Sequence, residues 1–313
     1  TSTSGPGLAL KAETIGLGVS TELPLVILDI QRGGPSTGLP TKTEQSDLLQ
    51  ALFGRNGESP VAVIAPQSPA DCFDAAREAA RIAVTYRTPV MLLSDGYLAN
   101  GSEPWRLPDV SALPDISITF ATEPNSVDPE GNPIFHGYDR DPETLARPWA
   151  VPGTPGLEHR IGGLEKEDGT GNVSYDPQNH SKMVHLRADK IAGIVADVDD
   201  VVPEGDEDAD ILVVGWGSTW GAIGGAVDRC RVRDHKVARI HLRHLNPLPA
   251  NLGDVLRRYD KILVPEMNLG QLSLLLRAEY LVDAKPLSKV QGAPFTAGEI
   301  ERAIIEALEG QDA

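Results

Sequence analysis

Short apolar runs without polar alternation recur through the first hundred residues of the chain and again after residue 210. Such runs, rich in Val, Ile and Leu, are typical of strands buried on both faces of a parallel sheet. Between them, apolar residues repeat at helical spacing. We therefore predict an α/β fold with helices covering parallel sheets. The predicted strands are residues 24–30, 61–65, 89–93, 211–215, 237–242, 261–265 and 287–290. The predicted helices are residues 7–20, 46–53, 176–196, 219–231, 251–258 and 296–308, with two more that begin near residues 68–71 and 270.

The pattern breaks down between about residues 100 and 175, where Pro, Gly, Asp and Glu are frequent. An irregular connection of this length is unusual inside a compact domain and usually serves a function or an interface. A lid over a site and a subunit-contact arm are both compatible with it. The acidic segment 197–210 has the composition of a linker. We expect one domain over residues 1–198, with the long insertion, and a second over 199–313.

Charge and cysteine content exclude several classes of function. With 28 basic and 45 acidic residues the net charge is −17, which argues against a nucleic acid or an anionic membrane as partner. No apolar run reaches the roughly 20 residues of a membrane span. Cys72 and Cys230 are far apart and lie in helix-like patterns, so we expect free core thiols in the reducing cytoplasm. Without a C-x-x-C motif the chain alone cannot hold an iron–sulfur cluster, and no histidine spacing predicts a metal site.

The most informative segment is the loop at residues 31–45, which follows a predicted strand. Ligands bind at the carboxyl ends of strands in open α/β sheets. Arg32 stands at the entrance of this loop among hydroxyl groups and glycines, and its guanidinium group can bind a small carboxylate through two hydrogen bonds. The alternative is a connecting loop whose arginine pairs with a nearby acid. Upstream, Ser4-Gly-Pro-Gly7 precedes a helix and could hold part of a cofactor.

Other motifs have simpler interpretations. Gly215-Trp-Gly-Ser-Thr-Trp-Gly221 is one residue too long for a dinucleotide fingerprint and is better read as a tight turn between strand and helix. Asp95-Gly96 has the character of a turn, and Pro265–Gln271 that of a capped helix at a domain edge. The residues show no Ser-His-Asp arrangement and no acid–base pair, so we assign no catalytic residue. Residue chemistry alone predicts a carboxylate site on an incomplete enzyme.

Several segments together resemble a known family. The loop Gln31-Arg-Gly-Gly-Pro-Ser-Thr-Gly-Leu-Pro-Thr41, with Thr3-Ser-Gly-Pro-Gly7 upstream and Ser68-Pro-Ala-Asp-Cys-Phe73 downstream, resembles the alpha subunit of 2-oxoacid:ferredoxin oxidoreductases. The nearest branch is the 2-oxoglutarate (KorA-like) enzymes. Leu92–Leu98 and Pro265–Leu272 agree with it. The resemblance implies a thiamine-enzyme pyrimidine-binding domain, incomplete at its N-terminus, followed by a transketolase C-terminal-like α/β domain.

The resemblance also implies a reaction. In that family a 2-oxoacid is oxidatively decarboxylated with coenzyme A as co-substrate, and the electrons pass through an iron–sulfur cluster to ferredoxin. Carried over by residue, Arg32 would hold the substrate carboxylate and Thr41 would bond to it. Thr3, with the turn at Ser4 and Gly5, would line the thiamine ring. Thiamine diphosphate with Mg²⁺ and a [4Fe-4S] cluster would be held mainly by a beta subunit.

The sequence departs from the family in one respect. The Tyr-Pro-Ile-Thr-Pro segment and the glutamate that activates the aminopyrimidine lie upstream of the Thr3 motif in the family and are absent here. We therefore expect a C-terminal piece of an alpha subunit whose N-terminal piece is a separate chain. It would work as a heterodimer or a dimer of heterodimers with the beta subunit, would reduce ferredoxin, and would be inactive alone. Pyruvate or a branched-chain 2-oxoacid as substrate and a non-catalytic scaffold remain alternatives.

Overall fold

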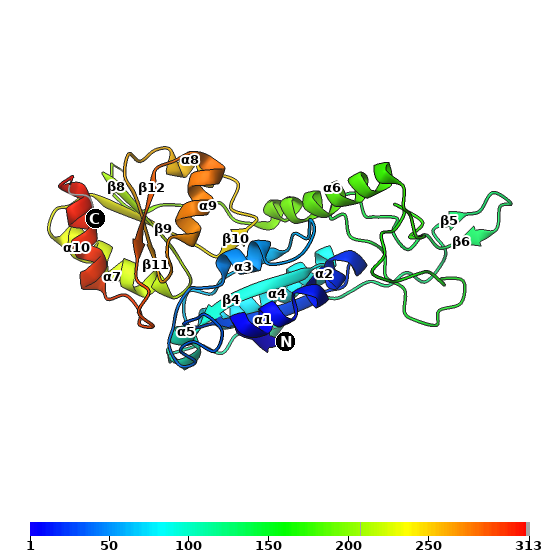
Figure 1. Cartoon of the computed structure of the whole chain (residues 1–313), viewed down its shortest axis with the longest axis horizontal. Coiled ribbons are helices and arrows are strands. Elements are labelled where there is room, and N and C mark those ends of the chain that lie inside the picture. Colours follow the sequence, from blue (N-terminus) through cyan, green and yellow to red (C-terminus); the bar gives the residue numbers. More distant parts are fainter. Residues whose placement is uncertain (207, 311–313) are drawn as a thin grey trace.

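The computed structural model describes residues 1–206 and 208–310 and contains two five-stranded sheets. The first has the order β1-β2-β4-β3-β10 (Figure 1). Its two longest strands pair in parallel along their whole length, and all seven residues of β4 are buried. Pro89 occupies the first position of that strand, where a missing N–H is tolerated. The strands are β1 (Ser2–Thr3), β2 (Leu25–Gln31), β3 (Ala62–Ile64), β4 (Pro89–Asp95) and β10 (His244–Asn246).

The helices of the first half largely follow the predicted pattern, with two corrections. The single helix predicted over residues 7–20 is two helices, which meet at the non-helical residue Lys11. The turn predicted at Asp95-Gly96 instead begins a short helix, because Asp95 Oδ1 accepts hydrogen bonds from the backbone N–H groups of Tyr97 and Leu98. The helices are α1 (Gly5–Leu10), α2 (Ala12–Thr21), α3 (Leu48–Phe53), α4 (Asp71–Tyr86) and α5 (Gly96–Asn100).

The second sheet has the order β12-β11-β8-β9-β7 and is parallel except for β7. β7 falls in the segment predicted as a linker, and β12 begins three residues before the predicted strand because its sequence, Ala-Lys-Pro-Leu-Ser, contains no apolar run. The strands are β7 (Glu204–Gly205), β8 (Ile211–Trp216), β9 (Val237–Leu242), β11 (Ile262–Glu266) and β12 (Ala284–Ser288). The helices are α7 (Trp220–Val232), α8 (Leu252–Leu256), α9 (Gln271–Tyr280) and α10 (Ala297–Leu308), with the 3-10 turn η3 (Gly217–Thr219) before α7.

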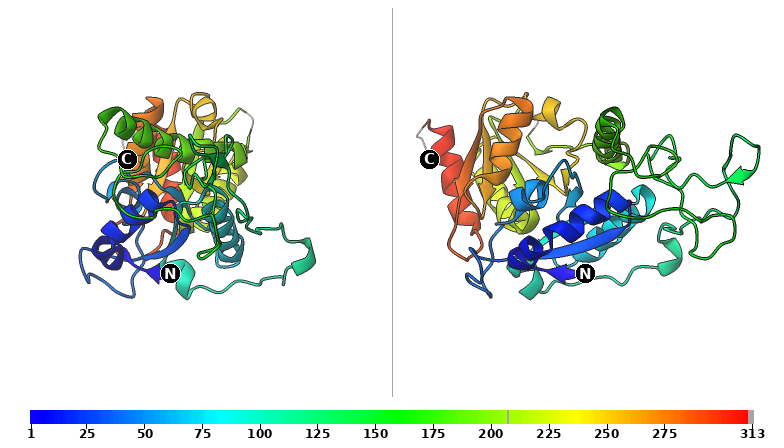
Figure 2. Two further views of the ribbon diagram at one scale, coloured as in Figure 1. Left: turned by 90° about the vertical axis from the view of Figure 1, so that its right-hand side faces the viewer. Right: turned by 45° about the vertical axis from the view of Figure 1, so that its right-hand side comes forward.

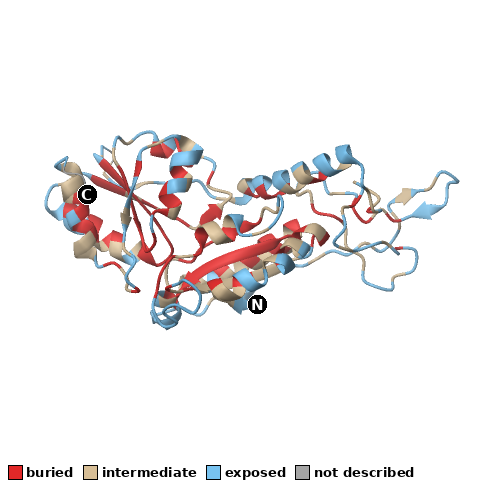
Figure 3. Ribbon diagram, in the orientation of Figure 1, coloured by how far each residue is buried: buried red, intermediate tan, exposed pale blue. Residues whose placement is uncertain are grey.

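The two sheets are joined by more than a linker. After β9 the chain leaves the second sheet and adds β10, antiparallel to β3, to the first sheet. One apolar core cluster contains Ile27 and Met91 of the first sheet together with Leu212 and Val264 of the second. Figure 3 shows the buried residues concentrated in and between the two sheets. The fold class predicted from the sequence, α/β with parallel sheets, is confirmed, but β10 was not anticipated.

The segment between α5 and α6 (Pro177–Gly193) contains only η1 (Val110–Ala112) and the short hairpin of β5 (Ser126–Val127) and β6 (Pro133–Ile134). It projects from one end of the molecule (Figures 1 and 2). The helix predicted over residues 176–196 is confirmed as α6 followed by η2 (Ile194–Asp197). None of the described helices is long and apolar enough to cross a membrane. Both cysteines are free, as predicted; Cys230 is a buried core residue as expected, whereas Cys72 is only half-buried.

Candidate functional site

The candidate residues gather at the carboxyl ends of three neighbouring strands. In the parallel register Thr3 of β1 lies beside Asp29 of β2, and Gln31 of β2 lies beside Asp95 of β4. The turn after β1 and the Arg32 loop after β2 therefore open at the same edge of the sheet. This is the edge where an open parallel sheet binds its ligands.

The Arg32 loop folds back on itself. The N–H of Gly33 donates to the carbonyl of Lys42 (3.0 Å), and the N–H of Leu39 donates to the carbonyl of Gly33 (2.7 Å). Gly38 has a φ of +47°, and a Cβ placed there would lie 2.0 Å from the Gly33 carbonyl oxygen, so the closed loop requires glycine. The closure brings the segments that carry Arg32 and Thr41 together at the base of the loop. The Thr41 side chain is exposed there.

The Arg32 guanidinium has no partner within residues 1–206 and 208–310: it donates no hydrogen bond and forms no ion pair within 4.0 Å. Its Nε is buried without an acceptor. Only the backbone carbonyl of Arg32 is engaged, accepting from Ser46 Oγ (3.1 Å). Arg32 acts electrostatically on Asp47, but it forms no direct pair with that acid, so among the described residues the alternative of an arginine paired with a nearby acid has only this longer-range support. A half-buried cation with unused donors favours an anion bound from outside the chain.

The turn after β1 forms a small cradle. A Cβ on Gly5 would lie 2.8 Å from both carboxylate oxygens of Asp47, and one on Gly7 would lie 1.9 Å from Thr3 Oγ1. The side chains of Asp47 and Thr3 fill the space beside these two glycines, so the backbone lies close to its neighbours there. Ser4 makes no side-chain capping bond to α1, and both Thr3 and Ser4 are half-buried. The hydroxyl of Thr3 lies against Gly7 and donates to the carbonyl of Ser4 (3.4 Å).

The structure adds an acid pair that the sequence analysis missed. Asp29 lies on the same face of β2 as Ile27 and Gln31, is completely buried, and finds no hydrogen-bond donor for either carboxylate oxygen. Burial and the neighbouring Asp47 carboxylate raise the pKa of Asp29 to about 8. Burial also raises the pKa of Asp47. The available signal was an aspartate inside an otherwise apolar strand.

The far end of the Arg32 loop is fixed to the second domain by Gln45. Its Nε2 donates to the carbonyl of Trp216 (2.8 Å), and its Oε1 accepts from the N–H of Met267 (3.0 Å). The Gln45 Nε2 also lies 2.9 Å from the position of a Cβ on Gly217, whose φ is +57°. The Gly215 motif is thus a tight turn, as predicted, and a side chain of this protein fills the space beside it.

The Pro265 motif is also a capped helix, as predicted. The carboxylate of Glu266 is fully buried and accepts hydrogen bonds from the N–H groups of Leu272 (2.8 Å) and Ser273 (3.0 Å) in the first turn of α9. Burial raises the pKa of Glu266. Asn268 Nδ2 donates both to Glu266 (3.0 Å) and to the carbonyl of Gln45 (2.8 Å), so the cap and the loop belong to one network.

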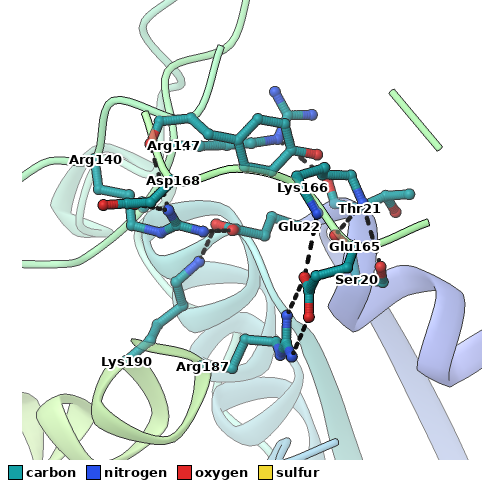
Figure 4. Close-up of polar contacts among 12 residues, drawn as sticks. Ser20, Thr21, Glu22, Arg140, Arg147, Glu165, Lys166, Asp168, Arg187 and Lys190 are labelled. Atoms are coloured by element: carbon teal, nitrogen blue, oxygen red, sulfur yellow. Dashed lines mark hydrogen bonds and ion pairs between the residues drawn. The ribbon is translucent and has the colours of Figure 1, made fainter. Parts of the chain in front are cut away.

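A second polar network lies at the opposite end of the first sheet (Figure 4). There the buried carboxylate of Glu22, which follows α2, forms ion pairs with Arg140 of the insertion and Lys190 of α6. Although burial alone favours the neutral acid, the two cations outweigh it and lower the pKa of Glu22. Two further cations bind backbone carbonyls at the end of α2. Arg147 Nε donates to the carbonyl of Thr21 (3.1 Å), and Lys166 Nζ donates to the carbonyl of Ser20 (3.1 Å).

These contacts place the insertion relative to the candidate site. Residues 20–22 precede β2, and Arg87, which donates to the carbonyl of Arg147 (2.6 Å), precedes β4. The part of the insertion that carries Arg140, Arg147 and Lys166 therefore packs at the amino ends of the strands, whereas the Arg32 loop lies at their carboxyl ends. This part is not a lid over the site. The first residues of the insertion run past the N-terminus of α4, where Glu103 accepts from the N–H of Ala70 (2.8 Å).

Comparison with protein families identifies the class to which this fold and site belong. Residues 1–175 match the family described as "Pyruvate flavodoxin/ferredoxin oxidoreductase, thiamine diP-bdg". Residues 209–294 match "Pyruvate:ferredoxin oxidoreductase core domain II". The chain belongs to this oxidoreductase family, as the resemblance of the sequence motifs predicted.

Individual relatives narrow the assignment. The 2-oxoglutarate oxidoreductase subunit KorA of Mycobacterium tuberculosis is 63% identical over 99% of this chain, which covers 46% of that protein. The 2-oxoglutarate synthase subunit KorA of Methanothermobacter marburgensis is 34% identical over 96% of this chain and 77% of that protein. The structure of 2-oxoglutarate:ferredoxin oxidoreductase from Magnetococcus marinus, with 2-oxoglutarate, coenzyme A and succinyl-CoA bound, superposes with a TM-score of 0.88 at 35% identity, over 98% of this chain and 52% of that one. This chain thus spans about half the length of the first and third of these relatives.

Proposed function

We propose that this chain is part of a cytoplasmic, thiamine diphosphate-dependent oxidoreductase that converts 2-oxoglutarate and coenzyme A to succinyl-CoA and carbon dioxide and reduces ferredoxin. The single observation that carries the proposal is the unpaired Arg32 guanidinium, which stands beside a glycine cradle at the carboxyl edge of a sheet in a chain of this family. The relatives named for 2-oxoglutarate support this substrate.

Arg32 and Thr41 would bind the substrate. A guanidinium group and a carboxylate form a charge-assisted pair whose geometry fixes the orientation of the bound molecule. Thr41, at the base of the closed loop, would add a hydroxyl donor. Holding the carboxylate in one orientation places the adjacent keto carbon for attack and lowers the entropic part of the barrier.

Thr3, Ser4 and Gly5 would line the ring portion of thiamine diphosphate, because the turn that carries them follows β1 at the carboxyl edge of the sheet and Thr3 and Ser4 are only half-buried there. When bound, the cofactor supplies a nucleophilic carbon and an electron sink for decarboxylation. The part of this chain in that chemistry is to line the ring and to orient the carboxylate that leaves as carbon dioxide. We assign no proton transfer during turnover to a residue of this chain.

The remaining groups would be held by partner chains. Within residues 1–206 and 208–310 no cluster of three or more His, Cys, Asp or Glu side chains could hold a metal ion. Cys72 and Cys230 lie in different helices, α4 and α7. We therefore propose that a beta subunit holds Mg²⁺, the diphosphate and the [4Fe-4S] cluster. We further propose that the complex includes an N-terminal piece of the alpha subunit and that ferredoxin accepts its electrons. The complex would be a heterodimer or a dimer of heterodimers.

The insertion would serve as a subunit-contact arm. Its part around Arg140, Arg147 and Lys166 is anchored at the amino ends of the strands, away from the Arg32 loop, and its surface carries many of the exposed large apolar side chains of the protein. These are Trp105, Leu107, Val110, Ile116, Phe120, Val127, Ile134, Val151, Ile161 and Leu164. A surface of this kind on a rigidly anchored segment favours burial against another chain.

The test uses the native complex, purified without oxygen and assayed for coenzyme A-dependent reduction of a low-potential acceptor with 2-oxoglutarate, pyruvate and branched-chain 2-oxoacids. We expect 2-oxoglutarate to be preferred. In that complex Arg32→Ala should lower kcat/KM about 100-fold, the value of a lost charge-assisted interaction. Arg258→Ala, at an exposed arginine, serves as the control.

Three outcomes would overturn parts of the proposal. Preference for pyruvate or a branched-chain acid would change the substrate but keep the chemistry. Full activity of Arg32→Ala would favour the scaffold alternative. Decarboxylation of 2-oxoglutarate by the isolated chain would contradict the need for partner subunits.

A further inference from the structure

We propose that Asp29 and Asp47 share a single proton beneath the candidate site, and that this proton sets the pH range in which Arg32 binds a carboxylate. The two aspartates act as positioning residues, since neither is placed to touch the substrate. This role of the acid pair adds a pH dependence to the proposed function and rests on that function for the role of Arg32.

The surroundings of Asp29 require a proton. Its side chain is 0% exposed, and neither carboxylate oxygen has a donor among the described residues. An ionised carboxylate without a partner is very unfavourable in such a place. The elements β1, α1 and α3 around it contain no titratable side chain, and the one acid of β4, Asp95, is engaged by the N–H groups of α5. The Arg32 guanidinium acts on the pair through Asp47 and forms no ion pair with Asp29 within 4.0 Å.

Asp47 is the group that faces Asp29, and it connects the pair to the site. Its Oδ1 accepts from Ser46 Oγ (2.9 Å), and the same hydroxyl reaches the carbonyl of Arg32 (3.1 Å). Its carboxylate lies against Gly5 in the cofactor cradle, and its field acts on the Arg32 guanidinium. The Oδ2 of Asp47 has no donor either.

One shared proton would link the two acids and serve one oxygen of each carboxyl group. Two facing carboxylates cannot hydrogen-bond each other unless one of them is protonated, and the pair then carries one negative charge instead of two. The strong upward shift of the pKa of Asp29, to about 8, agrees with this arrangement. Loss of the proton would place a second negative charge beside Arg32. That charge would compete with the substrate carboxylate for the same cation.

We expect the KM for the 2-oxoacid to be constant at neutral pH and to rise above about pH 8. Loss of one proton allows a rise of up to about tenfold per pH unit, and kcat should change less than KM. Asp29→Asn preserves the shape of the side chain and offers a donor to Asp47 but cannot ionise. In the assembled complex this variant should keep its neutral KM and lose the alkaline rise. Asp228→Asn, at an exposed residue of α7, should retain the wild-type profile.

An infrared titration of the same complex gives a readout that does not depend on turnover. The wild type should show a protonated-carboxyl band that disappears above about pH 8, and Asp29→Asn should lack that band. A wild-type KM that is flat to alkaline pH, or an alkaline rise that persists in Asp29→Asn, would overturn the proposal. If the band titrates as expected but no 2-oxoacid is turned over, the acid pair stands and the proposed function fails.

Discussion

The carboxylate of Glu22 forms an ion pair with the ammonium group of Lys190, 168 residues further along the chain. Both side chains are buried, and Arg140 of the insertion binds the second carboxylate oxygen. Three segments that are remote in sequence therefore meet at one carboxylate at the end of α2 (Figure 4). The insertion, which has little secondary structure of its own, is attached to the sheet through this point.

Removing the charge of Glu22 should destabilise the protein strongly. In Glu22→Gln, Lys190 and Arg140 stay buried without a counter-charge, and breaking such a pair typically lowers the free energy of unfolding by about 3–5 kcal/mol. Urea denaturation followed by circular dichroism measures the change. Asp254→Asn, which breaks the exposed pair with Arg257, is the control and should change the free energy of unfolding by less than about 1 kcal/mol. Equal effects of the two variants would show that the Glu22 network does not anchor the insertion.

Lys166 should make stability increase with pH in the alkaline range. The side chain of Lys166 is 2% exposed, and burial lowers its pKa to about 8 from an ordinary value of 10.5. Between about pH 8 and 10.5 Lys166 is therefore protonated in the unfolded chain but largely neutral in the folded chain. Because the unfolded state binds more protons in this range, the contribution of Lys166 to the free energy of unfolding rises as the pH increases from about 8 to 10.5. Urea denaturation of the wild type and Lys166→Met across this range tests it. The wild type should gain free energy of unfolding relative to Lys166→Met as the pH rises from about 8 to 10.5, and a constant or falling difference would contradict the prediction.

Replacing Gly38 should open the Arg32 loop. Alanine there would have both an unfavourable positive φ and a Cβ 2.0 Å from the Gly33 carbonyl oxygen. Gly57→Ala is a matched control, because Gly57 also has a positive φ (+67°) but no atom within 4 Å of the added Cβ. The control should lose about 1 kcal/mol from strain alone. Gly38→Ala should lose more and should in addition raise the KM of the assembled complex. Equal losses with unchanged KM would mean that loop closure does not position Arg32.

Gln45 should be needed to hold the two domains together. In Gln45→Leu the N–H of Met267 loses its acceptor in a buried interface, and the carbonyl of Trp216 loses one of its two donors but keeps Thr219 Oγ1, which together lower the free energy of unfolding by about 1–3 kcal/mol. Calorimetry of this variant should show a lower Tm than the wild type. Gln178→Ala, at an exposed position of α6, should leave the Tm within about 1 °C of the wild type. An unchanged Tm in Gln45→Leu would show that the side-chain hydrogen bonds of Gln45 do not help to hold the domains together, which the backbone bonds of residue 45 and the β10–β3 pairing would then do without them.

The sequence predicted what depends on local pattern. The buried runs of β2, β4 and β8 have no polar alternation, so their strand character and parallel pairing could be recognised. The placement of Arg32 on a loop after a strand followed from the same reasoning. Features that depend on distant contacts were not predictable: β10 is a three-residue strand whose partner, β3, lies 180 residues earlier.

The acid pair shows the same limit within the site. From the sequence, Asp29 could be assigned only to a strand. Its partner Asp47 lies 18 residues further along the chain, and the pattern of apolar residues does not specify how the loop between them folds. The break at Lys11 between α1 and α2 likewise has no marker in the sequence, since no proline or glycine stands at the junction itself. In both cases three-dimensional packing, and not residue preference, decides the outcome.

The antiparallel pairing of β10 with β3 has a consequence for any attempt to divide this protein. A strand from the second half of the chain completes the first sheet, and one core cluster continues through both. A proteolytic nick in the acidic stretch near residue 200 would therefore leave two fragments that remain associated as one particle. Cloning the halves separately would give pieces that each expose an unmatched sheet edge or an uncovered apolar surface, so they would have to be co-expressed to assemble.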